Sequence, residues 1–196
     1  MQGRFSVNTA RSGDCLRDHF LLAMPGLSEG IFSQSVTYIC EHGESGAMGI
    51  VINQPLELSV EEIFEHLKIV PCSDFSQQPV MAGGPVQIDH GFVLHRHCPI
   101  NWEASMRVTE EITLTTSCDI LRAIANDEGP AEHLIALGYA GWSAGQLEQE
   151  LAQNSWLTMP ASGDIIFETP PQQRLAEAAA LLGIDMNLIS AAAGHA

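Results

Sequence analysis

The sequence contains few basic residues. Only eight of its 196 residues are Lys or Arg, against 24 Asp or Glu, which gives a formal net charge of −16 at pH 7. A surface that binds nucleic acid needs clustered cations to displace counterions from phosphate groups. We therefore expect no direct nucleic-acid binding. The same negative charge disfavours anionic membranes and favours basic partners.

Long apolar runs and closely spaced cysteines are also missing. No stretch approaches the roughly 18 apolar residues of a membrane-spanning helix, and the first 19 residues are mixed polar, unlike a secretory signal. The five cysteines are odd in number and lie at least 20 positions apart, which excludes a CxxC motif and a secreted disulfide framework. These absences predict a cytoplasmic protein that does not contact membranes.

Hydrophobic patterning predicts a domain of the α+β class. A length of 196 residues favours one domain, at about 150 residues per domain. The runs of residues that we expect to form strands are 19–24, 36–40, 48–53, 92–95, 112–116, 134–139, 156–159 and 165–168. Since strands and helices do not alternate strictly, we predict a mixed, mainly antiparallel sheet with flanking helices. This single compact domain spans 19–196 and follows a loosely ordered arm over 1–18.

Four helices carry start or stop signals. Ser59 and Glu62 form a capping box ahead of apolar residues spaced i, i+3, i+4 and i+7. Ser117 is expected to cap a second helix, and Ser143 with Gln146 a third. Pro171 suits the first position of a fourth helix, which we expect to end near 183.

No established catalytic or phosphate-binding signature is present, and one histidine cluster is a candidate metal site. It contains His90, His95, His97 and Cys98. His95 and His97 would point to one side of a strand, but a tetrahedral site needs two more ligands at a fixed spacing. We predict no metal and no cofactor.

Two other segments carry polar or small residues at strand ends. Cys40 and His42 share one side of a strand, so they suit either a nucleophile with its base or a buried cysteine beside a histidine that anchors a loop. We favour the second interpretation, although a redox-active Cys40 is a further hypothesis. The run Gly83-Gly84-Pro85 predicts a tight turn, and the small residues of 138–142 allow a close approach by another backbone or a ligand.

Several short blocks together carry a resemblance to a known family. They are Phe20-Leu-Leu-Ala-Met-Pro25, Cys40-Glu-His42, Gly46-Ala-Met-Gly-Ile-Val-Ile-Asn53, Gly83-Gly-Pro-Val86, Gly91-Phe-Val-Leu-His95, Gly138-Tyr-Ala-Gly-Trp142, Ala144-Gly-Gln-Leu-Glu148 and Gly194-His-Ala196. In this order and spacing the chain closely resembles the bacterial AlgH/YqgE family over residues 18–196. The chain departs from the resemblance at Gln54 and His90, where arginines are expected, and this weakens any phosphate site near Gly84 and His95.

The resemblance implies a compact α+β protein without established enzymatic activity, and one member is named as a regulator of alginate production. Our leading hypothesis is a non-enzymatic regulatory or adaptor protein that acts through contacts with a partner protein and affects transcription indirectly. The alternative is a small-molecule-binding protein or hydrolase, with no residue assigned as catalytic. Its candidate pocket residues are Glu41, His42, Asn53, Gly83, Gly84, Pro85, His95, Tyr139 and Trp142.

Overall fold

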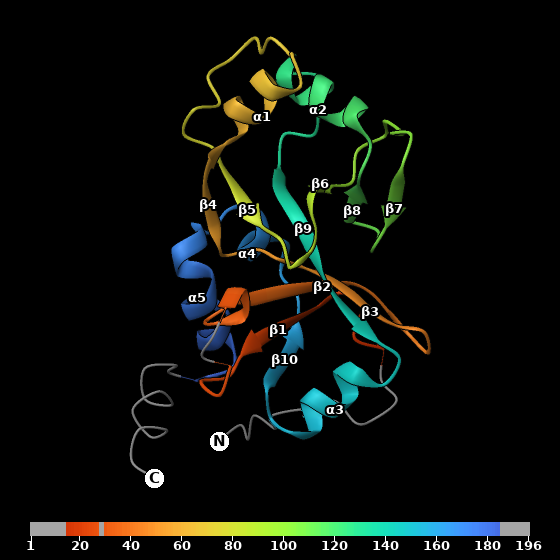
Figure 1. Ribbon diagram of the computed structural model, residues 1–196, viewed down its shortest axis with the longest axis vertical. Helices are drawn as coiled ribbons and strands as arrows, with labels where there is room; N and C mark the ends of the chain where they lie inside the picture. The colour runs from red at the N-terminus through yellow and green to blue at the C-terminus, as the bar shows by residue number, and fades with distance from the viewer. Residues whose placement is uncertain (1–14, 28–29, 185–196) are drawn as a thin grey trace, which may run out of the picture.

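One curled sheet organises the chain in the computed structural model, which describes residues 15–27 and 30–184 (Figure 1). This part of the chain forms ten strands and five α-helices. The strands are β1 (His19–Ala23), β2 (Val36–Gly43), β3 (Gly46–Val51), β4 (Pro55–Ser59), β5 (Pro79–Ala82), β6 (Val86–Arg96), β7 (Ser105–Arg107), β8 (Ile112–Thr115), β9 (His133–Ser143) and β10 (Trp156–Pro160). The helices are α1 (Val60–His66), α2 (Cys118–Ala125), α3 (Gln146–Ala152), α4 (Gly163–Phe167) and α5 (Arg174–Leu181), with 3₁₀ turns at Gly30–Phe32 and Pro171–Gln173.

The sheet is mainly antiparallel. Its strand order is β10-β1-β2-β3-β9-β6-β8-β7, and β5 pairs with both β4 and β9. The β5–β9 pair is parallel, whereas the other described pairs are antiparallel. The predicted α+β class with a mixed, mainly antiparallel sheet is confirmed.

Strand β9 joins two halves of the sheet by changing partners along its length. Its residues 133–137 and Tyr139 pair with β6, and residues 136–137 also pair with β5, whereas residues 140–143 pair with β3. The change occurs around Gly138, which has a φ of +73°. A Cβ at this position would lie 2.4 Å from the carbonyl oxygen of Gly84, so both the dihedral and the close approach require glycine.

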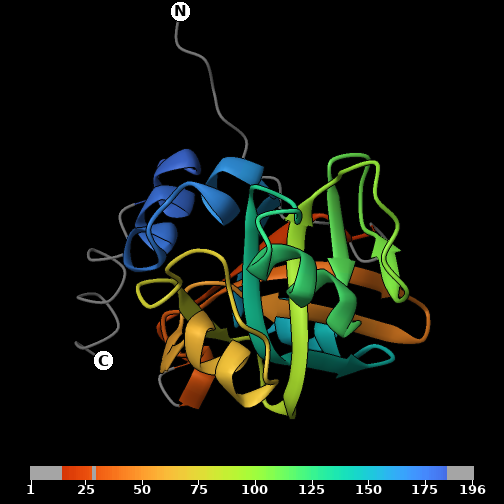
Figure 2. The ribbon, with the colours of Figure 1, turned by 90° about the horizontal axis from the view of Figure 1, so that it is seen from above.

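The helices cover different parts of the sheet. Helices α1 and α2 lie together at one end of the molecule, and α2 lies over β6 and β9 (Figures 1 and 2). Ile120 of α2 and Phe64 of α1 share a buried apolar cluster with Val93 and Ile135 of these strands. Helix α3 lies at the opposite end, where Leu147 packs in another cluster with both tryptophans of β9 and β10.

The caps that the sequence predicts form to different degrees. At α1 the Ser59 N–H donates to Glu62 Oε2 at 2.8 Å and the Glu62 N–H donates to Ser59 Oγ at 3.3 Å, so this capping box is confirmed. Ser117 is the N-cap residue of α2, but its hydroxyl donates to the Asp119 carboxylate. At α3 the Ser143 N–H donates to the Gln146 side chain, although the helix itself begins only at Gln146.

One strand prediction is wrong and three strands were not predicted. Residues 165–168 were expected to form a strand, but Ile165 and Ile166 lie in helix α4, where both are buried. Two adjacent apolar residues carry no period, so they do not distinguish a short helix from a strand. Strands β4, β5 and β7 have only three to five residues each, which leaves them little pattern to detect.

Most of the predicted arm and the block Gly194–Ala196 lie outside the described residues. Of the arm, residues 15–18 are described, and Leu16 is only 2% exposed. The Arg17 guanidinium reaches the Val108 carbonyl oxygen at 2.6 Å. These four residues therefore contact the folded domain.

Candidate functional site

His42 lies near the end of β2, and both of its ring nitrogens are hydrogen-bonded. Nδ1 accepts the backbone N–H of Leu16 at 3.0 Å, so Nε2 carries the proton and donates to Glu148 Oε1 at 2.8 Å. Glu148 belongs to α3, and bonds from its own backbone N–H and from His42 lower the pKa of its carboxyl. The imidazole holds residues 15–16 and α3 against β2, and neither ring nitrogen is left over for a substrate.

His95 lies on β6 in the interior and is 1% exposed. Its Nδ1 donates to the Arg96 carbonyl oxygen at 2.9 Å, which leaves Nε2 to accept the Thr115 hydroxyl at 3.0 Å. Because Thr115 gives its proton to His95, the Ser105 hydroxyl donates to Thr115 Oγ1 at 2.8 Å. Burial lowers the pKa of His95, which agrees with a neutral ring in this chain of hydrogen bonds.

The glycine turn after β5 is a place where two backbones cross. A Cβ on Gly83 would lie 2.3 Å from the Gly138 carbonyl oxygen, and one on Gly84 would lie 2.0 Å from the Tyr139 carbonyl carbon. Asn53 also bonds to backbone, since its Oδ1 accepts the Val36 N–H and its Nδ2 donates to the Gln34 carbonyl. The close approach that the glycines allow is made by strand β9.

Some of the candidate pocket residues do meet in one cavity. Glu41, Tyr139 and Trp142 line a cavity of about 620 Å³ beside the β2–β3 hairpin, and the Tyr139 ring packs edge-on against Phe92. His95 lines a different cavity of about 410 Å³. His42 and His95 lie on different strands, β2 and β6, and His95 lines a cavity other than the one that Glu41, Tyr139 and Trp142 share.

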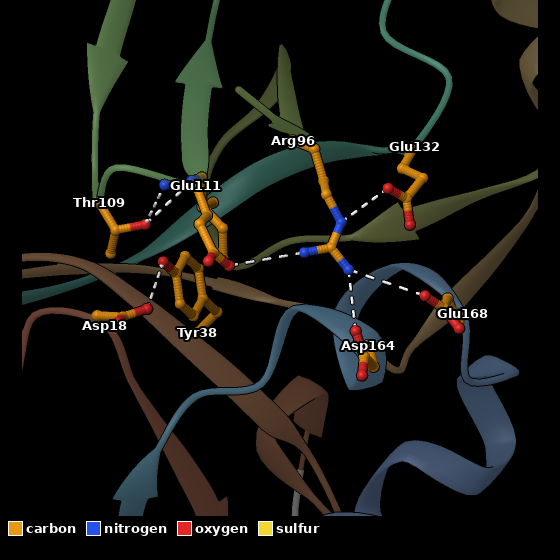
Figure 3. Close-up of polar contacts among 9 residues, drawn as sticks. Asp18, Tyr38, Arg96, Thr109, Glu111, Glu132, Asp164 and Glu168 are labelled. Atoms are coloured by element: carbon orange, nitrogen blue, oxygen red, sulfur yellow. Dashed lines mark hydrogen bonds and ion pairs between the residues drawn. The ribbon is translucent and has the colours of Figure 1, made fainter. Parts of the chain in front are cut away.

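Arg96, which the sequence patterns did not single out, is the centre of an ion-pair network (Figure 3). Its guanidinium lies 2.7 Å from Glu132 and 2.9 Å from Asp164, with Glu111 at 3.7 Å and Glu168 at 3.8 Å. The hydrogen bond to Asp164 is the largest of the contributions that raise the pKa of Arg96. The network ties α4 to the end of β6 and to the loop before β9.

A second polar contact lies beside this network (Figure 3). The Tyr38 hydroxyl donates to Asp18 Oδ1 at 3.0 Å. Burial raises the pKa of Asp18 and also that of Tyr38. Thr109 Oγ1 accepts the Glu111 N–H, which fixes the turn that carries Glu111 toward Arg96. The contact between Tyr38 and Asp18 joins β2 to the segment before β1, whereas the contact between Thr109 and Glu111 lies within one turn.

An apolar groove of about 540 Å³ lies between α1 and α2 over strands β6 and β9. Its lining combines aliphatic side chains with acidic and histidine side chains, namely Leu58, Glu62, Ile63, His66, Leu67, Asp89, His90, Gly91, Val93, Thr116, Ser117, Cys118, Leu121, Ile135 and Leu137. Leu67 is 40% exposed at this groove. The sequence patterns placed Ile63 and Leu67 on the apolar face of α1, but they did not show that part of this face stays uncovered.

The histidine cluster that is a candidate metal site in the sequence is divided by the fold. His90 lines the groove between α1 and α2, whereas His95 and His97 line the 410 Å³ cavity. Within residues 15–27 and 30–184, no group of three or more His, Cys, Asp or Glu residues is placed to hold a metal ion. In the same part of the chain, no helix is both long and apolar enough to cross a bilayer.

The chain was compared with known proteins. Residues 20–187 match the family described as DUF179, AlgH-like. A UPF0301 protein of Saccharophagus degradans is 56% identical over 92% of this chain and 89% of its own length. Another, from Thioalkalivibrio sulfidiphilus, is 57% identical over 91% of this chain and 96% of its own length.

Two solved structures share the fold. The solution structure of the AlgH protein of Pseudomonas aeruginosa has a TM-score of 0.77 and 47% identity, and covers 95% of this chain and 99% of its own. A crystal structure of a protein from Corynebacterium diphtheriae has a TM-score of 0.73 at 18% identity, covering 94% of this chain and 96% of its own, which shows likeness of fold alone.

Proposed function

The chain belongs to the AlgH-like family, and on that premise we propose that it is a non-enzymatic adaptor that binds a segment of a partner protein in the groove between α1 and α2. The observation that carries the proposal is the groove itself, a concave apolar surface between two helices. We place the protein in the cytoplasm. A regulatory role would act through the bound partner, since the low content of Lys and Arg leaves little to hold nucleic acid.

The apolar lining suits an anchoring side chain of the partner. The groove is lined by aliphatic side chains from two helices and two strands, namely Ile63 of α1, Leu121 of α2, Leu58 of β4 and Leu137 of β9. Interfaces gain most of their binding free energy where an apolar or aromatic side chain fills such a pocket. We therefore expect the partner segment to insert an aliphatic or aromatic side chain.

The charges around the groove suit a basic partner. Glu62 and Asp89 lie in the lining, and the side chain of Asp89 is 86% exposed. The chain as a whole carries a net charge of −16, which attracts cationic segments over a distance that depends on salt. The partner segment is therefore expected to place Lys or Arg beside its apolar anchor.

The alternative, a small-molecule binder or hydrolase that uses His42 and His95, has less support. Both rings have their nitrogens in hydrogen bonds within the fold, and the Cys40 thiol is 1% exposed. A nucleophile with its general base needs two such groups within reach of each other and of a substrate. A free ring nitrogen for the base and an accessible thiol for the nucleophile are both missing among these three residues.

A large side chain introduced at Gly91 should fill the groove. Gly91 lines the groove, and a Cβ built on it meets no atom within 4 Å, so Gly91→Phe projects a ring into the open space. Gly43, at the end of β2, is equally free of contacts and lies outside the groove lining. Gly43→Phe is the matched control, because it adds the same side chain to a different strand.

A phage-displayed library of random peptides supplies the probe. We expect the wild-type protein and Gly43→Phe to select peptides with an apolar residue flanked by Lys or Arg. Added salt should weaken the binding of these peptides. Filling the anchor pocket should remove about 2 kcal/mol or more of the binding free energy. Gly91→Phe should therefore bind the same peptides at least ~30-fold more weakly. Selected peptides that bind Gly91→Phe equally well, or a selection that yields only acidic or uncharged sequences, would overturn the proposal.

A further inference from the structure

Strand β6 runs past the end of β8, so part of its edge has no neighbouring strand (Figure 2). The pairing of β6 with β8 begins at Val93, which faces Thr115. The chain then turns away from β6, since the Thr116 N–H donates to the Ala104 carbonyl oxygen at 2.9 Å. On this side, residues 89–92 therefore have no strand partner in the described part of the chain.

Strand β9 holds the other side of this edge. Gly91 and Phe92 pair with Leu137 and Ala136 of β9, and an irregularity in the pairing precedes Gly91. In an antiparallel sheet, successive residues direct their N–H and C=O groups alternately to the two sides of a strand. About half of the residues 89–92 therefore direct these groups away from β9. Such a row of unpaired groups is a template for a further strand.

The edge opens into the groove between α1 and α2. Asp89, His90 and Gly91 are consecutive residues of the groove lining, and residues 116–118 line the groove as well. Asp89 and His90 are exposed, and a Cβ built on Gly91 meets no atom within 4 Å. The four residues of the edge span about 14 Å at the rise of a strand, which is the length of a bound segment of about four residues. The edge is thus bordered by open space rather than by packed side chains.

The two faces of this edge differ in chemistry. Neighbouring residues of a strand point to opposite faces. Val93 accordingly packs in the apolar cluster of α1 and α2, whereas Phe92 lines the 620 Å³ cavity that Glu41 also lines. A strand added beside β6 places every second side chain over the apolar groove and the others over the face on which Glu41 lies.

We propose that the partner segment binds as an added β-strand on the edge of β6 formed by residues 89–92. This inference rests on the proposed function, because it specifies how the groove recognises its basic segment. Main-chain hydrogen bonds to the edge supply affinity, and alternate side chains supply specificity. Apolar side chains of the segment contact Ile63 and Leu121 in the groove, and Lys or Arg alternates with them on the other face, toward Glu41.

Methylation of single backbone nitrogens in a synthetic peptide tests this geometry. The probe is the tightest-binding peptide of the phage selection, and each variant of it lacks one N–H. Methylation at every second residue should weaken binding at least about fivefold, as expected for one lost hydrogen bond, and methylation of the residues between them should change it less than about twofold. A bound helix uses its N–H groups internally, so equal losses at consecutive positions would overturn the proposal.

Amide hydrogen exchange of the ¹⁵N-labelled full chain gives a second measurement. Of the neighbouring amides of Gly91 and Phe92, one faces β9 and the other faces the groove. The unmethylated peptide should slow exchange of the groove-facing amide at least about tenfold more than that of its neighbour. An equal effect on the two amides would contradict strand addition.

The two proposals fail in different ways. Peptides that bind the wild-type protein and Gly43→Phe but not Gly91→Phe, yet show no alternation on methylation, would overturn the added strand and support the groove as the binding site. A selection that yields no peptide sensitive to Gly91→Phe would overturn both proposals.

Discussion

Replacing Gly138 by alanine tests whether the crossing of β9 over the glycine turn holds the two halves of the sheet together. The substitution adds one methyl group at a φ of +73° and places it 2.4 Å from the Gly84 carbonyl oxygen. It also lies 3.0 Å from the carbonyl oxygen of Val86, the first residue of β6. Both neighbours are backbone atoms, so neither moves away without shifting a strand.

The magnitude follows from two independent costs. A non-glycine residue in the left-handed region costs about 1–2 kcal/mol. Overpacking against fixed atoms adds about 1–3 kcal/mol. We therefore expect Gly138→Ala to lower the free energy of unfolding by about 2–5 kcal/mol, which corresponds to a fall in Tm of roughly 4–20 °C for a domain of this size.

Gly145 is the matched control for this prediction. Its φ is +75°, nearly the same as that of Gly138, but a Cβ on it meets no atom within 4 Å. Gly145→Ala should therefore show only the cost of the dihedral angle, about 1–2 kcal/mol. Urea unfolding followed by circular dichroism measures both variants. Equal destabilisation of the two would refute the argument from close backbone approach.

Three further predictions concern the interior. Glu150→Ala should lower the free energy of unfolding by about 2–4 kcal/mol, because it leaves two buried indole N–H groups without an acceptor. Glu150→Gln should retain most of the stability, and urea unfolding of the two variants measures the difference. Burial lowers the pKa values of His95 and His133, so the unfolded chain binds protons more readily than the folded chain, and the free energy of unfolding should fall as the pH drops below about 6.5. His95→Gln should reduce this fall, and a pH profile of stability that the substitution leaves unchanged would contradict the argument. Burial raises the pKa of the Cys40 thiol, so iodoacetamide should modify the exposed Cys118 of the native protein and leave Cys40 unmodified. Mass spectrometry measures the labelling of each cysteine, and early labelling of Cys40 would support the redox hypothesis.

The start of α1 was predictable from the sequence because its cause is local. The capping box joins Ser59 and Glu62 across three positions, and it needs no partner from elsewhere in the chain. The segment 165–168 shows the opposite case. Ile165 and Ile166 fit a strand or a helix equally well, and packing against the central apolar cluster decides the result.

The candidate site was predictable only in part. Small residues at 83–84 and 138–141 indicated a close approach, but the sequence could not show that these two segments approach each other. His42 was a candidate from its position beside Cys40, yet its partners lie 26 and 106 positions away along the chain. Hydrogen bonds over such separations have no signature in a single sequence.

The sequence by itself determined the acidic charge, the α+β class and the local caps, because composition and short-range hydrogen bonds do not depend on distant contacts. Only the tertiary structure decided which side chains share a cavity. The groove draws on α1, α2, β6 and β9, and a second cavity brings together His97 and Arg107, which lie ten positions apart along the chain. Cavities arise where packed elements leave space between them, and that depends on how the whole chain folds rather than on any one segment.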